Sequence, residues 1–284
     1  MSAITGTPSA LGTFNFAITA TDSSTGSGPY SSAPRGYSIV VLDNPPVTNS
    51  GTLTVAYNAA ATPVPLNITG GTPTSVAIAS TPTTGTAIAT GTTITYQPAA
   101  GFAGSDSFTY TASNSGGTSV PATVTVTVSE PVITITAGGS LAATVAVAYT
   151  QTFTWSGGAQ PWSSYQVTNL PAGVSITGTT ANTVTISGTP TQAGSFNLNV
   201  SATDSSTGNG PYSVGEAFTL TVAGPTLALA PAGTTFTAPY NVAYSQSFTA
   251  SGGVGPYTYA RTGTLPPDLS FAGNTVSGTP ATPG

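Results

Sequence analysis

Residues 186–212 read ISGTPTQAGSFNLNVSATDSSTGNGPY, and residues 4–30 read ITGTPSALGTFNFAITATDSSTGSGPY. The two stretches align without a gap, and a third copy begins at Val276 with VSGTPATPG. A second block also repeats, since AYTQTFTWSGG at 148–158 matches AYSQSFTASGG at 243–253. Internal repetition of this kind indicates a chain built from copies of one structural unit.

Both blocks belong to one domain, which is whole only at residues 130–223. About seven segments in this stretch alternate apolar and polar residues, with turn residues roughly every 8–12 positions, a pattern typical of an immunoglobulin-like (Ig-like) β-sandwich. The alternating Asn197, Asn199 and Ser201 are expected to face water. Alternation assigns the following side chains to the core: Phe153, Trp155, Val184, Ile186, Phe196, Leu198, Val200, Ala202, Phe218, Leu220 and Val222.

Residues 44–128 form a different module. It contains ITYQP at 94–98 and AGFAGSDSFTY at 100–110, and it closes with ATVTVTV at 122–128. Alternation predicts strands here too, with Phe108 and Tyr110 on one face and Val124, Val126 and Val128 on another. The sequence therefore predicts an all-β protein made of tandem Ig-like sandwich domains in a linear array.

The composition excludes many kinds of chemistry. The 284 residues contain no His and no Cys, so the usual zinc, haem and iron–sulfur sites and the Ser-His-Asp triad are excluded. No lysine can form a Schiff base, and Arg35 and Arg261 are too few to neutralise a nucleic-acid backbone. The formal charge of −5 disfavours anionic membranes. No apolar run reaches the roughly 18 residues of a spanning helix, so no membrane insertion is expected.

Residues 130–223 resemble the PIG Ig-like repeat of large bacterial surface proteins. The resemblance rests on the SGG that follows an aromatic strand and on four further motifs: LPAGV at 170–174, ISGTP at 186–190, AGSF at 193–196 and ATDS at 202–205. Residues 44–128 resemble the bacterial cadherin-like/Ig-like tandem repeat through the core at 94–110 and the terminal valine strand. In this second module NITGGTP at 67–73 replaces the acidic segment usual in the family, so the resemblance does not extend to calcium binding there.

Four segments are predicted: the C-terminal half of a PIG-type domain at 1–42, a cadherin-like domain at 43–129, a complete PIG-type domain at 130–223 and an N-terminal half at 224–284. A two-stranded ribbon or a half-sandwich is at best marginally stable alone, so both halves need a partner. That partner is either a flanking repeat of a longer chain or a second copy of this chain bound head to tail. The motif GTP occurs at both ends, at 6–8 and 278–280, which favours the longer chain.

The loops that begin at Asp22 and Asp204 allow two interpretations. Each offers one carboxylate among hydroxyls and backbone carbonyls, which makes Asp22 and Asp204 weak calcium candidates. The alternative, which we favour, is a hydroxyl-rich Asx-type turn. An aspartic protease or a glycosidase needs two carboxylates close together. The two DSSTG sequences lie in different domains and the other acidic residues are scattered along the chain, so neither kind of site is expected.

Aromatic residues recur at turns, at Tyr30, Trp162, Tyr212 and Tyr257. They either cap their own sandwich or contact a sugar ring or a neighbouring subunit.

The resemblances imply an extracellular or cell-surface bacterial protein. We expect a structural, non-enzymatic fibre, stalk or filament without a cofactor. Its partners would be itself, bound head to tail, or flanking repeats. The runner-up interpretation is an adhesin or carbohydrate-binding repeat region of a large surface protein or extracellular enzyme, with glycans as partners.

Overall fold

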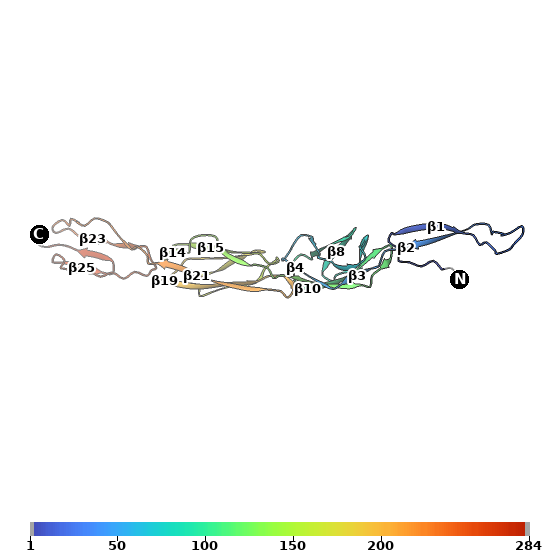
Figure 1. Ribbon diagram of the computed structural model, residues 1–284. Helices are drawn as coiled ribbons and strands as arrows, with labels where there is room; N and C mark the ends of the chain where they lie inside the picture. Colours follow the sequence, from blue (N-terminus) through green and yellow to red (C-terminus); the bar gives the residue numbers. More distant parts are fainter. Residues whose placement is uncertain (1–2, 282–284) are drawn as a thin grey trace. The chain divides into compact units, whose positions relative to one another are not determined.

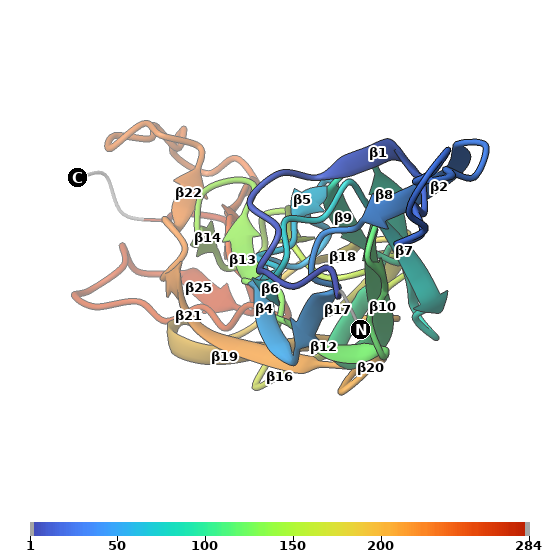
Figure 2. The same cartoon turned by 45° about the vertical axis from the view of Figure 1, so that its right-hand side comes forward.

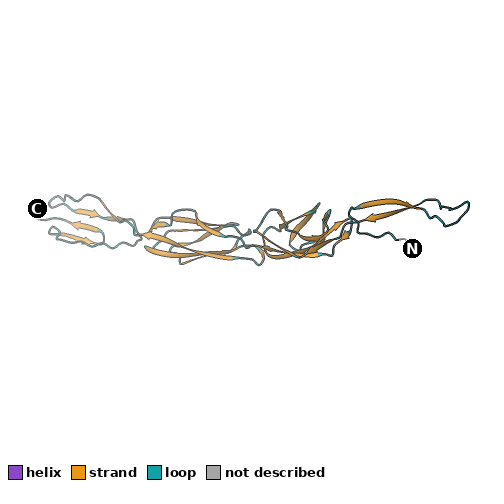
Figure 3. Ribbon diagram, viewed as in Figure 1, coloured by secondary structure: helices purple, strands orange, loops and turns teal. Residues whose placement is uncertain are grey.

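The computed structural model describes residues 3–281, which form only strands and connecting loops (Figure 3). This part of the chain therefore offers no helix that could cross a membrane. The backbone contacts separate two compact units, Met1–Pro131 with Ser206–Gly210, and Val132–Ser205 with Pro211–Gly284. The order of the strands along the chain can be followed in Figure 1.

The first unit contains one complete sandwich with β10 (Phe102–Asn114) at its centre. This long strand pairs antiparallel with β12 (Ala122–Val128), which in turn pairs in parallel with β4 (Gly51–Val55). β10 also pairs with β7 (Ser75–Ser80), β11 (Gly117–Thr118) and β20 (Thr207–Gly208). The remaining strands form two small sheets: β3 (Pro46–Asn49) with β6 (Asn67–Gly70), and β9 (Thr93–Pro98) between β5 (Thr62–Pro63) and β8 (Gly85–Thr90).

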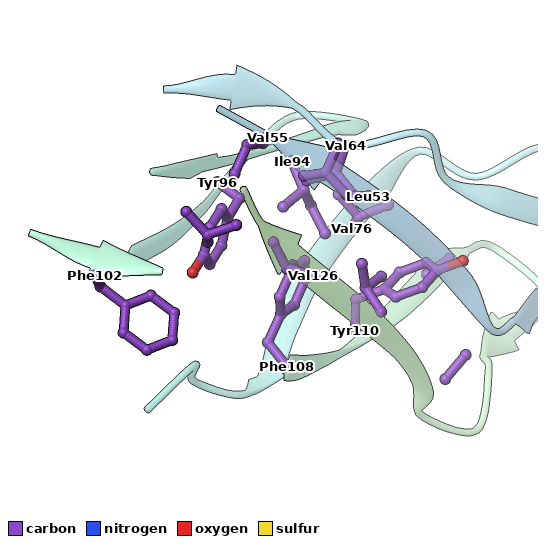
Figure 4. Close-up of a cluster of buried hydrophobic side chains, with 14 residues drawn as sticks. Leu53, Val55, Val64, Val76, Ile94, Tyr96, Phe102, Phe108, Tyr110 and Val126 are labelled. Atoms are coloured by element: carbon purple, nitrogen blue, oxygen red, sulfur yellow. The ribbon is translucent and has the colours of Figure 1, made fainter. Parts of the chain in front are cut away.

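The core of this sandwich forms between the sheets because apolar residues alternate along each strand. Ile94, Tyr96, Phe108, Tyr110 and Val126 are fully buried, and the rings of Tyr96 and Phe108 stack with centroids 6.3 Å apart (Figure 4). The predicted core positions on β10 and β12 are confirmed.

The second unit contains the complete PIG-type sandwich, which has two four-stranded sheets. One has the order β13-β15-β18-β17, and the other has the order β14-β21-β19-β16. The strands of the first sheet are β13 (Thr134–Ala137), β15 (Tyr149–Ser156), β17 (Val174–Thr179) and β18 (Thr183–Gly188). Those of the second are β14 (Ala142–Thr144), β16 (Ser163–Thr168), β19 (Gly194–Thr203) and β21 (Ser213–Ala223). The three residues of β14 are too few to show alternation, which is why the sequence indicated fewer strands.

The core of the second sandwich also follows the predicted alternation. Phe153, Val184, Ile186, Leu198 and Leu220 are completely inaccessible to solvent. Asn197 and Asn199 are exposed as expected, whereas Ser201 is half-buried. β19 and β21 pair antiparallel from Gly194↔Val222 to Thr203↔Ser213, side by side at the centre of their sheet (Figures 1 and 2).

The ISGTP motif is explained by the backbone at Gly188. Its φ is +148°, and a Cβ there would lie 2.1 Å from the carbonyl oxygen of Gly173. Gly278 in the C-terminal copy has a φ of +147° and would place a Cβ 2.0 Å from the carbonyl oxygen of Asp268. Only glycine fits such a position, so the two copies share the same local geometry.

The chain also forms strands before and after the two complete sandwiches. Near the N-terminus, β1 (Gly12–Ile18) and β2 (Arg35–Val41) form an antiparallel hairpin. After residue 223, β22 (Ala228–Ala230) pairs with β24 (Thr249–Ser251), and β26 (Thr275–Gly278) lies between β23 (Tyr244–Ser247) and β25 (Leu269–Ala272). Among the described residues, neither terminal segment contributes to the two buried clusters.

The buried side chain of Leu198 provides a test of the second core. We expect Leu198→Ala to lower the free energy of unfolding by about 2–5 kcal/mol, because it leaves a cavity in a closed core. Both tryptophans of the chain, Trp155 and Trp162, belong to this core, so the change is read from tryptophan fluorescence during urea unfolding. The control is Asn199→Ala, the exposed neighbour on the same strand, and an equal effect of both variants would contradict the assigned core.

Candidate functional site

The two candidate calcium loops are closed turns with the same hydrogen bonds. The Asp204 N–H donates to the carbonyl of Tyr212 (3.0 Å), and the Tyr212 N–H donates to Asp204 Oδ1 (2.8 Å). The Asp22 N–H donates likewise to the carbonyl of Tyr30 (3.0 Å), and the Tyr30 N–H donates to Asp22 Oδ1 (2.9 Å). Each carboxylate therefore joins the two ends of its own loop.

The surroundings of the two carboxylates differ. Buried Asp204 also accepts the N–H of Ala159 on Oδ2, at 3.0 Å. Exposed Asp22 instead accepts the hydroxyl and the N–H of Ser24, and these bonds together with that of Tyr30 hold the pKa of Asp22 below its ordinary value. Each loop supplies one carboxylate, and residues 3–281 contain no cluster of three His, Cys, Asp or Glu side chains that could hold a metal ion.

A third carboxylate, Asp106, was not singled out from the sequence. It is buried at the start of β10 and accepts the Tyr96 hydroxyl (2.8 Å), the N–H and hydroxyl of Thr83 (3.0 Å each) and the N–H of Thr84 (3.3 Å). Burial alone would raise the pKa of Asp106. The hydrogen bonds to the ionised carboxylate, of which the bond from the Tyr96 hydroxyl has the largest effect, hold the pKa below its ordinary value. Burial and the nearby carboxylate raise the pKa of Tyr96. Alternation could have identified Asp106, because it shares the inward face with Phe108 and Tyr110.

The four candidate contact aromatics lie in different environments. Trp162 is only 4% exposed and packs against Trp155 with ring centroids 6.2 Å apart, so it caps its own core. Tyr212 and Tyr257 are half-buried, and the Tyr257 hydroxyl donates to the carbonyl of Gly252. Tyr30 is 62% exposed at the end of the β1–β2 hairpin loop. Each of the four therefore has its own local surroundings in the described part of the chain.

The hairpin carries an apolar face that is exposed in the described part of the first unit. Phe14 lies opposite Ile39, and Phe16 lies opposite Tyr37, whose ring it stacks on at 5.8 Å. Phe14 is 47% and Ile39 42% exposed. An exposed apolar sheet face with two free edges is typical of a binding surface.

Residues 224–281 enclose an apolar groove in place of a core. Two adjoining hollows of about 570 and 510 Å³ share Phe248, Leu265 and Val276 in their walls. Leu229, which lines the second hollow, is 56% exposed, whereas the matching Ile135 of the complete sandwich is 6% exposed. The hairpin face and the groove are two separate uncovered apolar features, and each is a candidate binding surface.

Comparison with protein families identifies both complete domains. Residues 43–127 match the family described as "Bacterial Ig domain". Residues 125–223 match the family described as "Putative Ig domain". No curated protein sequence is significantly similar to this chain.

Solved structures of several kinds are similar to this chain at low identity. The protocadherin GammaB4 extracellular domain is 15% identical, with a TM-score of 0.32 over 95% of this chain and 49% of that one. A titin fragment is 12% identical, with a TM-score of 0.37 over 72% and 75% of the two chains. An endo-fucoidan hydrolase of glycoside hydrolase family 107 is 19% identical, with a TM-score of 0.31 over 76% of this chain and only 34% of its own length. All three TM-scores lie below 0.5, so the fold assignment rests on the strands and registers themselves.

The Asp106 hydrogen bonds provide a test that depends on pH. At pH 7 we expect Asp106→Asn to cost the first unit about 1–3 kcal/mol, because buried donors lose a charged acceptor. The folded pKa is lowered, so the contribution of Asp106 is present above the unfolded pKa of about 3.9 and is lost as the pH falls below it. The difference between wild type and variant should therefore shrink from pH 7 to pH 3, as measured by circular dichroism during urea unfolding.

Two controls accompany this measurement. Glu130→Gln removes one exposed carboxylate and should change little. Tryptophan fluorescence reports only the second unit and should be the same in all three proteins. A difference at pH 3 as large as that at pH 7 would contradict the stabilising role of the ionised carboxylate.

Proposed function

Because this chain contains bacterial immunoglobulin-like repeats, we propose that it is a non-enzymatic structural protein of the bacterial cell exterior, a spacer of Ig-like domains within a surface fibre or stalk. Bacterial Ig-like repeat families are typical of surface or extracellular proteins. The observation that carries the proposal is that each complete repeat has its own closed hydrophobic cluster. A domain with its own core can in principle fold by itself, so such domains can be joined in series.

The polar groups of the chain support the same role. Asp22, Asp106 and Asp204 are each occupied by hydrogen bonds that hold turns and strand ends together. Each carboxylate is used by a turn or strand end of its own domain, where it stabilises the local structure. This arrangement favours a supporting function over a catalytic one.

The strand order also suits a domain that carries tension. In the first unit β4, near the start of its domain, pairs in parallel with the last strand β12 through the positions Gly51–Val55. In the second unit β14 pairs in parallel with the last strand β21 at Ala142–Thr144. Pulling the two ends of such a domain loads the parallel hydrogen bonds together, in shear, whereas an antiparallel terminal pair would open one bond at a time.

Single-molecule pulling tests this proposal. We expect two unfolding events from the complete sandwiches, each releasing on the order of 300 Å of chain at about 3.6 Å per residue. The event from the first unit should need the higher force, since five registered pairs join β4 to β12 but only three join β14 to β21. Leu198→Ala should lower the force of the other event alone. Extension without distinct events would contradict the mechanical role.

The location is tested separately on intact cells that produce the protein. An antibody raised against the purified chain should label the outer surface in immunogold electron microscopy. A cytoplasmic protein labelled in parallel serves as the control for cell integrity. Labelling of this chain that requires permeabilised cells would overturn the extracellular assignment.

A further inference from the structure

We propose that the β1–β2 hairpin of one copy inserts into the groove of residues 224–281 of a second copy and completes a sandwich there, so that chains join head to tail. The inference rests on the proposed structural function and names the partner of its open ends. The occupant is a second copy of this chain, and the contacts follow from the complete sandwich in the second unit.

The hairpin has the register of the two strands that the groove lacks. Phe16 faces Tyr37 in β1–β2, and Leu198 faces Phe218 at the matching positions of β19–β21. All seven registered pairs of the hairpin, from Gly12↔Val41 to Ile18↔Arg35, have a counterpart between Gly194↔Val222 and Val200↔Glu216. The hairpin is therefore folded as the central pair of a PIG-type sheet.

Residues 224–281 hold the other half of the same sandwich. β23-β26-β25 has the register of β15-β18-β17, since Tyr244↔Gly278↔Leu269 repeats Tyr149↔Gly188↔Val174. β22 and β24 likewise repeat the pairing of β13 with β15. Within the described residues this segment has no strand pair that matches β19 and β21, and the apolar groove lies against the sheet residues that such a pair would cover.

An aromatic contact indicates how the groove is filled. In the complete sandwich Phe153 packs against Phe218 of β21 with ring centroids 5.0 Å apart. The counterpart of Phe153 is Phe248 in the groove wall, and the counterpart of Phe218 is Tyr37 of the hairpin. Insertion would place Tyr37 of one copy against Phe248 of the next.

A hydrogen bond across the joint follows from the aspartate loop. In the complete sandwich the N–H of Ala159 donates to Asp204 Oδ2 and links the SGG turn to the back half of the domain. The hairpin retains the aspartate as Asp22, while the residue that matches Ala159 is Val254 in the other half. Val254 is 52% exposed, and insertion would bring its N–H to Asp22 Oδ2.

The sizes of the core residues favour this hairpin as the occupant. The groove side is smaller than in the complete sandwich, with Ala250 at the position of Trp155 and Val276 at that of Ile186. The hairpin side is larger, with Phe16 for Leu198 and Ile18 for Val200. The larger hairpin residues offset part of the volume that the smaller groove residues leave open, the direction that a tolerated exchange in a core requires.

The first test measures the association of the full 284-residue chain. Sedimentation velocity over a range of concentrations should show a series of multimers that grows with concentration, since the contact uses different surfaces on the two copies. A monomer at all concentrations, or a single closed dimer, would overturn the proposal.

Charged substitutions on the two surfaces give the sharper test. Phe16→Asp blocks the hairpin and Val276→Asp blocks the groove, so each variant alone should be monomeric. An equimolar mixture should give a heterodimer and nothing larger, because each variant retains one working surface. The controls Ser38→Asp and Ser245→Asp place the same charge on outward-facing exposed positions of the same hairpin and the same sheet, and they should assemble as wild type does.

A disulfide trap tests the register, since the chain contains no cysteine. In the complete sandwich Val167 lies directly opposite Val200, and the matching pair across the joint is Thr262 and Ile18. Directly opposed strand residues have Cα atoms about 4.5–5.5 Å apart, which suits a disulfide. The chain with Ile18→Cys and Thr262→Cys should give a ladder of linked multimers under oxidation.

The matched control shifts the register by one residue, with Ile18→Cys and Arg261→Cys, and should link at least tenfold less. The inserted geometry would be overturned if both cysteine pairs formed disulfides to the same extent, or if multimers formed without disulfides between the Ile18→Cys and Thr262→Cys residues. A failure of the head-to-tail joint can be told apart from a failure of the proposed surface function. A chain that is monomeric but lies on the cell surface and unfolds in two mechanical steps refutes the joint alone.

Discussion

The antiparallel pairing of a PIG-type repeat's last two strands is the constraint on which the other parts of its sandwich depend. β19 and β21 occupy the middle of their sheet, with β16 and β14 along their outer edges. Their inner face carries Leu198 and Leu220, which are buried only because the opposite sheet covers them. The β1–β2 hairpin keeps this pairing without the flanking strands or the opposite sheet. The backbone hydrogen bonds between β1 and β2 are formed, but the apolar side chains on one face of the hairpin remain exposed.

The same comparison shows how much of the fold the sequence could predict. Strict alternation in SFNLNVSA and FTLTV identified both the strands and their buried face, because each inward residue is apolar and each outward one is Asn, Ser or Thr. Because residues 4–30 repeat residues 186–212, the same alternation predicted the strands of residues 12–41. Short strands such as β14 could not be found in this way. Their pairing depends on where β21 lies, and nothing in three residues of their own sequence shows it.

Carboxylates mark the limit of prediction for the candidate site. Asp22 and Asp204 stand at the start of a Ser-rich loop, so an Asx-type turn could be inferred from neighbours in the sequence. Asp106 binds Thr83 and Thr84, more than twenty residues earlier in the chain, and no local pattern announces that contact. The uncovered face of residues 224–281 was expected from the sequence, because the repeat showed that this segment lacks the last strands of its domain, whereas the residues that line the groove could be named only from the structure.

The duplicated GTP motif, which favoured a longer chain when only the sequence was considered, fits an inserted hairpin once the contacts are known. In the complete sandwich the carbonyl of Pro190 accepts the N–H of Ala146, and in the C-terminal half the carbonyl of Pro280 already accepts the N–H of Asn241, both at 2.9 Å. The groove segment therefore supplies its own copy of this turn. The donor has to provide only strands from Gly12 onward, and residues 4–8 of the incoming copy can remain outside the core. In the proposed joint, the two GTP copies would belong to different chains, and they would not need to occupy the same position.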